Sequence, residues 1–303
     1  MRPLSVGVQL PEVEREVRWN EMRSMAVLTE ETGFDSIWVG DHLIYRPEDG
    51  PARGPWEAWS LLAAIAAVTD KVEIGPLVAA TAFHSPAMLA KKAITVDEIS
   101  GGRLVLGLGA GWNRAEFGAF GYPFDHRASR FEEAFHIIRR LVKGDEVDHQ
   151  GRYYNTDRAE ILPAGPRQGG PPILIGSQGP RVLKATAPFM DQWNGWYAWY
   201  GNSPDGLPGL LGKLESACDE VGRDSSDITK TAAVLAALPG GKGRIHGDAE
   251  NEGKDPLSGS PAEIADILGQ YADLGIAHVQ MVLDPITAES IDWFASVLAE
   301  LDA

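Results

Sequence analysis

The 303-residue sequence is poor in the features that mark several common classes of protein. Its single cysteine, Cys218, excludes an internal disulfide, and the apolar spacing around it predicts a buried position on a helix. The most apolar window, residues 58–68, is about half as long as a bilayer span requires. The N-terminus leads directly into a strand-like run instead of the apolar core of a signal peptide. We therefore expect a cytoplasmic protein with no membrane partner.

Positive charge is also scarce. The 27 Lys and Arg are outnumbered by 43 Asp and Glu, which gives a formal net charge of −16, and no run of basic residues is longer than two. Such a chain would repel a phosphate backbone, so nucleic acid is not expected as a partner. The seven histidines show no metal-ligand spacing, and the serine elbow Gly-x-Ser-x-Gly does not occur. A dinucleotide fingerprint starting at Gly107 fails because Trp112 stands where its third glycine is required. No metal is predicted.

Short apolar, β-rich runs recur eight times along the chain and alternate with segments of helical periodicity. Strands are expected at residues 4–10, 34–40, 72–79, 103–110, 172–177, 191–196, 228–238 and 277–283. This alternation predicts an α/β protein: one domain over residues 1–303 that forms a parallel (β/α)8 TIM barrel, with insertion segments at its C-terminal mouth.

One helix start and two long connections stand out in the sequence. A capping box at Ser260-Pro261-Ala262-Glu263 predicts a helix start. Residues 144–172 are expected to form an irregular connection. Residues 239–259 are rich in glycine and charge, hold almost no apolar side chains, and are predicted to be a mobile loop that acts as a lid.

In such a barrel the reactive groups lie where strands end and loops begin. The second strand ends in Asp41-His42, a carboxylate beside an imidazole that can exchange a proton near neutral pH, so both are predicted to be catalytic or to contact a cofactor. The alternative is that Asp41 caps a turn and His42 is merely exposed. The third strand leads to Thr81 and His84 at a helix start, an arrangement that suits an anionic or carbonyl group.

Later strand ends carry small and aromatic residues. The glycines of residues 107–111 let a flat or bulky group approach the backbone beside Trp112, unless they form only a tight turn with a core tryptophan. Residues 176–179 precede a helix, where free amides form a phosphate cradle, although Pro180 gives the same pattern in a purely structural turn. Five aromatics within residues 193–200 would wall an apolar pocket or form a dimer contact.

The ordered set of segments resembles the luciferase-like monooxygenase superfamily, and more narrowly its branch that uses the 8-hydroxy-5-deazaflavin coenzyme F420. The resemblance is carried by the strand ends above together with Gln9, residues 100–104, 151–154 and 171–176, and Asp-Gln-Trp-Asn at 191–194. It implies a (β/α)8 barrel, commonly homodimeric, with the deazaflavin across the C-terminal mouth. It also implies that Asp41 and His42 contact the ring and that Leu77 and Val78 form a bulge with a non-prolyl cis peptide. The other residues that it assigns to the cofactor are Gln9, Ala80, Thr81, Gly109, Ala110, Gly111, Asn113, Gly176, Ser177, Gln178 and Gly179.

The activity implied by the resemblance is hydride transfer between F420 and an apolar or aromatic small molecule. The expected catalytic residues are His42, Asp41 and Trp112, and the expected pocket residues are Trp193, Trp196 and Tyr197. Glucose-6-phosphate dehydrogenases of this branch carry a glutamate acid at the place of Trp112, so a sugar phosphate is not expected here. Three alternatives remain open: an FMN-dependent monooxygenase, a non-catalytic cofactor-binding barrel, and a metal-dependent barrel hydrolase.

Overall fold

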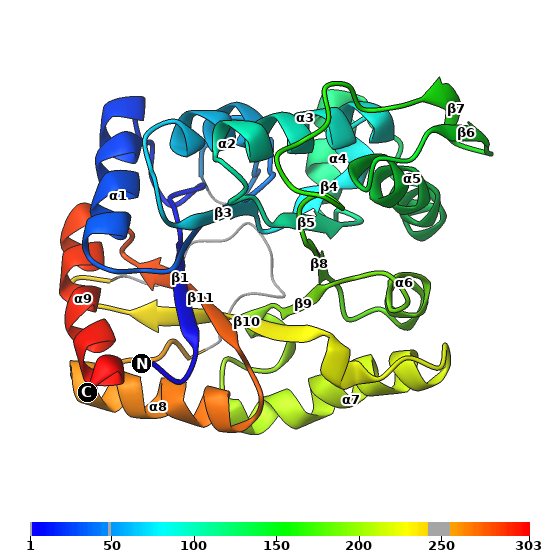
Figure 1. Cartoon of the computed structure of the whole chain (residues 1–303). Helices are drawn as coiled ribbons and strands as arrows, with labels where there is room; N and C mark the ends of the chain where they lie inside the picture. Colours follow the sequence, from blue (N-terminus) through cyan, green and yellow to red (C-terminus); the bar gives the residue numbers. More distant parts are fainter. Residues whose placement is uncertain (1, 48–49, 242–254) are drawn as a thin grey trace.

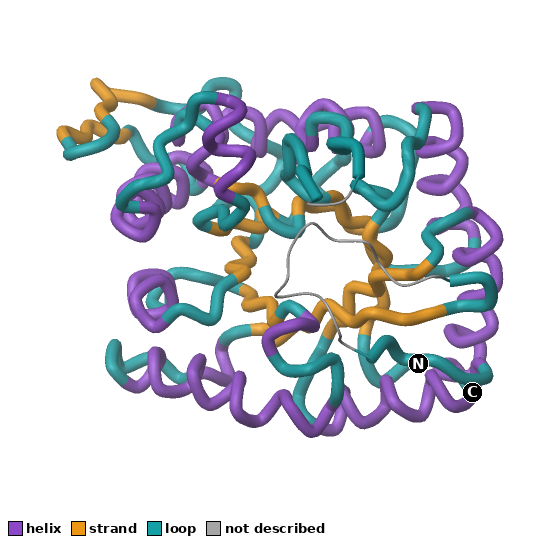
Figure 2. Tube along the Cα trace, turned by 180° about the vertical axis from the view of Figure 1, so that it is seen from behind, coloured by secondary structure: helices purple, strands orange, loops and turns teal. Residues whose placement is uncertain are grey.

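A parallel barrel surrounded by helices forms the body of the protein (Figures 1 and 2). The computed structural model describes residues 2–47, 50–241 and 255–303. The barrel sheet has the order β3-β2-β1-β11-β10-β9-β8-β5-β4, with every pairing parallel. Its strands are β1 (Ser5–Gln9), β2 (Ser36–Val39), β3 (Glu73–Pro76), β4 (Ala79–Ala80), β5 (Leu106–Gly109), β8 (Ile173–Gly176), β9 (Gln192–Gly195), β10 (Thr229–Ala237) and β11 (His278–Asp284).

Strands β3 and β4 are two halves of one barrel strand. β3 pairs with β2, and its Ile74 bridges Leu104 just before β5, whereas β4 pairs with β5 directly. The strand is interrupted between them at Leu77-Val78, which are joined by a non-prolyl cis peptide as the resemblance implies. The nine segments therefore act as eight barrel strands, and the predicted (β/α)8 fold is confirmed.

Each barrel strand is followed by a helix that packs on the outside (Figure 1). These helices are α1 (Trp19–Glu31), α2 (Ala58–Ala66), α3 (Pro86–Ile99), α5 (Arg127–Val142), α6 (Pro180–Thr186), α7 (Leu207–Asp219), α8 (Pro261–Asp273) and α9 (Ala288–Asp302). The predicted capping box is present at the start of α8, where Ser260 and Glu263 satisfy each other's backbone N–H groups. Arg2, near the beginning of the chain, donates to Asp302 near its end, so the two ends lie together.

The main core lies between the strands and the helices, and Cys218 is buried in it as expected. A second, smaller cluster fills the barrel: Trp38, Leu77, Val105, Leu174 and Ala233, with Val78 and Trp196 against it. Below that cluster the hydroxyl of Ser36 accepts from the Trp38 indole and bonds to His278 Nε2. Burial lowers the pKa of His278 to about 4, so this ring is neutral and structural.

Several inserted segments follow barrel strands at the C-terminal mouth, as predicted. They are the short helix α4 (Arg114–Phe120) after β5, and the 3-10 turns η1 (Thr81–Phe83) after β4 and η2 (Tyr197–Trp199) after β9. The 3-10 turns η3 (Pro204–Gly206) and η4 (Ser225–Asp227) flank α7. Most of the predicted lid, residues 242–254, lies outside the described residues. Within the described part, Leu257 pairs with Ala236 of β10.

The expectation of an irregular connection over residues 144–172 is wrong in part. This segment contains an antiparallel hairpin, β6 (Val147–Gln150) and β7 (Asn155–Ala159), which projects beside α5 (Figures 1 and 2). Its turn is fixed by the carboxylate of Glu133 on α5, which accepts from the backbone N–H groups of Tyr153 and Tyr154. The hairpin thus depends on a contact distant in sequence, which explains why local polarity suggested a loop.

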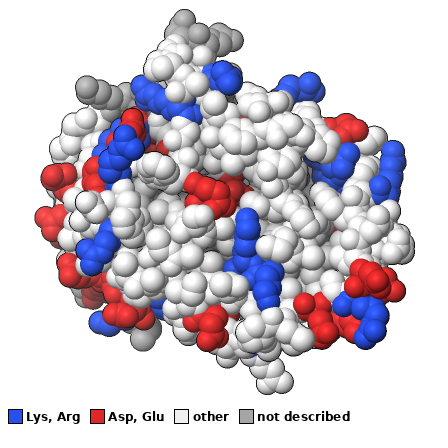
Figure 3. Space-filling view, turned by 90° about the horizontal axis from the view of Figure 1, so that it is seen from above, with Lys and Arg blue, Asp and Glu red and all other residues white. Residues whose placement is uncertain are grey.

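Charges on the face seen in Figure 3 occur in small separate groups, and acidic and basic side chains adjoin in only some of them. Ion pairs of this kind within the described residues include Arg181 with Glu132 and Lys184 with Glu220. This face carries no continuous basic surface. Within the described ranges, no helix is both long and apolar enough to cross a membrane.

Candidate active site

The end of β2 places Asp41 and His42 at the mouth of the barrel, with different surroundings. Asp41 is 3% exposed, and one of its oxygens accepts from the backbone N–H of Ala80 (2.9 Å) and lies 2.8 Å from His84 Nε2. Asp41 therefore ties the end of β2 to the end of β4 and orients His84. The sequence analysis treated Asp41 and His84 as separate candidates, whereas the structure shows them in contact.

His42 lies between two buried carboxylates. Its Nδ1 is 3.0 Å from the Glu116 carboxylate, and its Nε2 is 3.6 Å from Glu12 Oε1. The side chain of His42 is 19% exposed, whereas those of Glu12 and Glu116 are 4% and 1% exposed. The rings of Tyr45 and Trp112 lie against the imidazole, with centroids 4.8 and 5.5 Å away.

This arrangement favours the charged form of His42. Burial of the ring acts against the charge, but the negative charge of Glu12, the hydrogen bond and charge of Glu116, and the charge of Asp41 outweigh it. Together they raise the pKa of His42 to about 9. At neutral pH the group is therefore an imidazolium that can donate a proton or a hydrogen bond.

The carboxylates around His42 are themselves held in place. Glu116 accepts from the backbone N–H of Leu43 (2.6 Å) and, at longer range, of Ile44 (3.3 Å). Glu12 accepts from Gln9 Nε2 and from the Tyr45 hydroxyl, both at 2.9 Å. Charge-assisted bonds of this kind fix both carboxylates and, through them, the imidazole.

Sequence reasoning did not identify Glu12 or Glu116. Glu12 lies just beyond the end of β1, only three residues after the predicted Gln9, so a search that extended past strand ends would have found it. Gly40 leaves room for the Glu12 side chain, because a Cβ at position 40 would lie 2.6 Å from the Glu12 carboxyl group. Glu116 lies on the inserted helix α4, and nothing in the local sequence connects it with His42.

Trp112 lies at the site and stands where the resemblance places a glutamate in the glucose-6-phosphate dehydrogenases of the branch. Its side chain is 41% exposed and packs edge-on against His42. An indole does not supply a proton in the way a carboxyl group does. In this chain the carboxylates come from Glu12 and Glu116, and Trp112 presents an apolar surface beside the imidazolium.

The glycines of β5 and β8 have a steric role that the sequence analysis did not foresee. A Cβ on Gly109 would lie 2.6 Å from Val78 Cγ2, and one on Gly176 would lie 3.0 Å from Val78 Cγ1. A Cβ on Gly107 would meet the Pro76 carbonyl at 2.1 Å and Val78 at 3.1 Å. The group that approaches these glycines is therefore the bulge residue Val78, which fills the space they leave.

Beyond Gly109 the predicted cofactor residues form the turn into α4. Gly111 has a φ of +75° and lies against Phe117, so it serves a tight turn. The Thr81 hydroxyl donates to the Gly109 carbonyl at 3.3 Å. Asn113 caps α4 through the N–H of Ala115 and donates to the Ile44 carbonyl, and Ala110 is partly buried. Both ends of the Asn113 amide are thus engaged within the protein.

The predicted phosphate cradle follows β8. Ser177 Oγ accepts from the N–H of Gly179, and Gln178 Oε1 accepts from Lys213 Nζ at 3.0 Å. Gly179 has open space around it, since an added Cβ would meet only Ser177 Oγ, at 3.7 Å. Lys213 therefore brings a positive charge beside this turn.

Two of the three residues predicted to line the pocket, Trp193 in β9 and Tyr197 after it, are fully buried. Trp193 is fully buried and donates from Nε1 to the Ser177 carbonyl, which places it in the layer between barrel and helices. Tyr197 is also fully buried. Neither ring offers surface to a substrate in this structure. Trp196 is partly exposed and packs on the cluster inside the barrel, and its role in a substrate pocket stays a prediction.

No group of three or more metal-ligating side chains with suitable geometry occurs within residues 2–47, 50–241 and 255–303. The candidate active site in that part of the molecule is the His42 imidazolium at the barrel mouth, held beside two buried carboxylates.

Comparison with known proteins agrees with this fold. The sequence profile of the luciferase-like monooxygenase family matches residues 4–239. The chain belongs to this family. A 5,10-methylenetetrahydromethanopterin reductase of Archaeoglobus fulgidus is 34% identical over 176 residues, which cover 58% of this chain and about half (49%) of that protein's length. An F420-dependent glucose-6-phosphate dehydrogenase of Nakamurella multipartita is 28% identical over 301 residues, with 86% of this chain and 85% of the relative covered.

Several solved structures share the barrel. An F420-dependent secondary alcohol dehydrogenase in complex with an F420-acetone adduct superimposes with a TM-score of 0.82 at 21% identity, covering 99% of both chains. The oxygenating constituent of 3,6-diketocamphane monooxygenase from Pseudomonas putida, in complex with FMN, gives a TM-score of 0.70 at 16% identity, covering 97% of both chains. At such identities the likeness establishes the luciferase-like fold.

Proposed function

We propose that the chain is an F420-dependent oxidoreductase that transfers a hydride between the deazaflavin and an apolar or aromatic small molecule. The observation that carries this proposal is the paired His42 imidazolium at the barrel mouth, with the exposed Trp112 indole beside it. Curated relatives of similar sequence are named as F420-dependent enzymes.

The residues at the mouth fit a phosphorylated ring cofactor. Gln9 Oε1 is buried and has no hydrogen-bond partner among the described residues, although its amide group is fixed by Glu12. Residues 176–179 combine an open backbone at Gly179 with the nearby charge of Lys213, which suits a phosphate. Gln9, the Leu77–Val78 bulge and residues 176–179 would hold the cofactor.

The cofactor, when bound, supplies the hydride chemistry at C5 of its deazaflavin ring. The protein supplies the proton. Glu116 holds His42 at Nδ1, so Nε2, which is 3.6 Å from Glu12 and beyond hydrogen-bonding distance, is the nitrogen left to exchange a proton with a reacting oxygen. Because the pKa of His42 is about 9, this group donates at neutral pH and accepts a proton only in alkaline solution. We therefore propose that carbonyl reduction is the faster direction at neutral pH.

A titration of the apoprotein with F420 and with FMN, followed by fluorescence, tests the cofactor. Tight binding of F420 and weak binding of FMN are expected; the reverse would favour the FMN-dependent monooxygenase. Turnover of small ketones with reduced F420 then separates an enzyme from a non-catalytic cofactor-binding barrel. His42→Ala is expected to fold and bind F420 but to lose about 100-fold or more in turnover. Unchanged turnover would remove His42 from the mechanism. A homodimer and a cytoplasmic location remain predictions.

A further inference from the structure

His42 and Glu12 lie farther apart than oppositely charged groups in a protein interior usually do. A charge-assisted hydrogen bond between such groups closes to about 2.7–2.9 Å. His42 Nε2 instead stays 3.6 Å from Glu12 Oε1. The charge still acts on the ring: burial lowers the pKa of His42, and Glu12 is the foremost of the groups that raise it. Glu12 is thus near enough to favour the charged ring and too far to accept its proton.

The Tyr45 hydroxyl holds the Glu12 oxygen that faces His42. It donates at 2.9 Å to Oε1, the same atom that lies 3.6 Å from His42 Nε2. Gln9 Nε2 donates to the other oxygen, Oε2, also at 2.9 Å. The backbone of Glu12 is fixed as well, because its N–H donates to the Glu14 carboxylate at 2.9 Å. Glu12 is therefore restrained at both oxygens and at its backbone, and it can approach the imidazole only by stretching these bonds.

Tyr45 is anchored independently of Glu12. An antiparallel bridge joins its backbone to Arg53: the Tyr45 N–H donates to the Arg53 carbonyl at 2.6 Å, and the Arg53 N–H donates to the Tyr45 carbonyl at 3.0 Å. The Tyr45 side chain is buried, and its ring packs against His42 and Trp112 with centroids 4.8 and 6.1 Å away. A donor fixed in this way can hold a carboxylate at a set distance from a neighbouring group.

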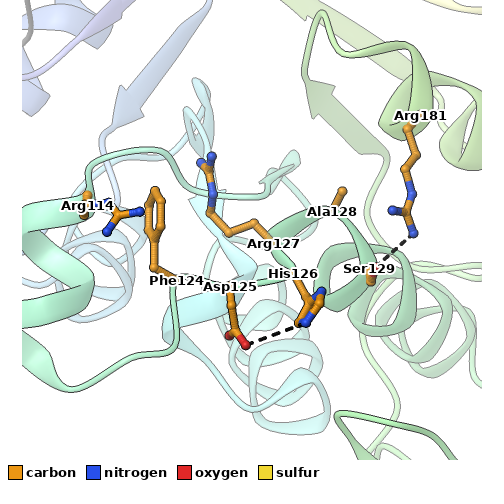
Figure 4. A pocket seen from close by; sticks show the side chains of 8 residues that line it. All are labelled: Arg114, Phe124, Asp125, His126, Arg127, Ala128, Ser129 and Arg181. Atoms are coloured by element: carbon orange, nitrogen blue, oxygen red, sulfur yellow. Dashed lines mark hydrogen bonds and ion pairs between the residues drawn. The ribbon is translucent and has the colours of Figure 1, made fainter.

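The other side of the imidazole is held by helix α4, which carries Glu116 in its first turn. The start of α4 is itself anchored. Arg114, its first residue, and Arg127 of α5 lie over the Phe124 ring, with guanidinium carbons 4.4 and 4.3 Å from the ring centroid (Figure 4). Arg127 also donates to the carbonyl of Gly111, in the turn before α4, at 2.6 Å. The ring is thus oriented from its Nδ1 side, and the gap at Nε2 depends on what restrains Glu12.

We propose that Tyr45 is a positioning residue that keeps Glu12 out of hydrogen-bonding distance from His42 Nε2, so that this nitrogen stays available to a substrate oxygen. Glu12 then favours the protonated ring without accepting the proton that the ring delivers. The importance of Nε2 rests on the proposed function. The position of Glu12 does not, because it is a property of the protein without cofactor.

The first test therefore uses the apoprotein, with its histidine rings labelled with ¹⁵N. NMR follows the exchange of the two His42 ring protons with water at neutral pH, and the Nδ1 proton bonded to Glu116 is the internal reference. Tyr45→Phe keeps the ring and removes only the hydroxyl. Glu12 should then close on Nε2 and slow the exchange of its proton about tenfold or more, while exchange at Nδ1 stays constant. Unchanged or faster exchange at Nε2 would overturn the proposal, whatever the cofactor.

The second test measures turnover of a small ketone with reduced F420. Tyr45→Phe should lose about 10- to 100-fold in turnover because Glu12 occupies the donating nitrogen. In a Glu12→Gln background the same change should cost less than about twofold, because a neutral amide forms no ion pair with the imidazolium. Tyr271→Phe is the matched control: it removes a buried hydroxyl from the outer helix α8 and should change neither measurement.

The melting temperature of each variant establishes that it is folded. Turnover that is unchanged in Tyr45→Phe, or a loss that persists in full in the Glu12→Gln background, would overturn the positioning role of Tyr45 and leave the proposed function intact. Failure of the wild-type protein to bind F420 would instead refute the proposed function. The exchange measurement on the apoprotein would then still decide whether Tyr45 sets the position of Glu12.

Discussion

The two carboxylates that flank His42 make a quantitative prediction for Glu116→Gln. The pKa of His42 lies at about 9 instead of 6.5, which corresponds to about 3 kcal/mol of preference for the charged ring in the folded protein. Glu116 and Glu12 are the principal sources of that preference. Removing the charge of Glu116 while keeping its shape should lower the pKa of His42 by about 1–2 pH units.

The sign of the effect on stability follows from the raised pKa. His42 contributes fully to the free energy of unfolding below pH 6.5, and the contribution is lost as the pH rises through about 9. The wild-type free energy of unfolding should therefore fall by up to about 3 kcal/mol across this range through His42 alone. In Glu116→Gln the fall should be about half as large, should still begin near pH 6.5, and should be complete at a lower pH than in the wild-type protein.

Two measurements check these values. Titration of labelled histidine rings by NMR, with the His42 signal assigned through His42→Ala, gives the pKa directly. Urea unfolding at several pH values gives the stability curve. Glu146→Gln, on the exposed hairpin, is the matched control and should change neither. If the pKa of His42 in Glu116→Gln matched the wild-type value within error, the paired-imidazolium interpretation would be refuted.

Three further predictions concern packing, ion pairing and substrate choice. Gly109→Ala should lower the free energy of unfolding by about 1–3 kcal/mol because its Cβ would overlap Val78, and Val78→Ala in the same chain should recover part of the loss; urea unfolding that showed no loss would contradict the packing argument. Arg167→Ala should cost about 3–5 kcal/mol because it leaves the fully buried Asp97 carboxylate without its ion-pair partner; an unchanged melting temperature would show that Asp97 does not need this charge. Trp112→Ala should raise the Michaelis constant for an apolar substrate about tenfold while the melting temperature stays constant, and an unaltered Michaelis constant would remove Trp112 from the pocket.

Much of the fold could be predicted because the apolar periodicity of each element is local. All eight barrel strands fall at the expected places, and only β4 and β11 extend one residue beyond the expected ranges. The β6–β7 hairpin was missed because its strands are polar and partly exposed, and because Glu133, on a neighbouring helix, fixes its turn. Such a contact leaves no trace in a local pattern.

The site could be predicted in part for a similar reason. Strand ends directed attention to Asp41 and His42, which lie together at the barrel mouth; their catalytic role stays a prediction. Nothing local distinguishes Glu116 from the other 42 acidic residues, because its importance arises only when α4 folds back over the end of β2. Trp193 was expected in the pocket but lies in the core between barrel and helices. Adjacent strand residues face opposite sides of the sheet, and aromatic content alone does not determine which side a given residue faces.

The interrupted barrel strand also constrains how this protein can vary. Gly109 and Gly176 come from two different strands, yet both are kept free of side chains by the same isopropyl group. These two positions and Val78 therefore form one steric unit, in which enlarging any member requires shrinking another. A relative with an uninterrupted third strand would be released from this restriction and could carry ordinary side chains at both places.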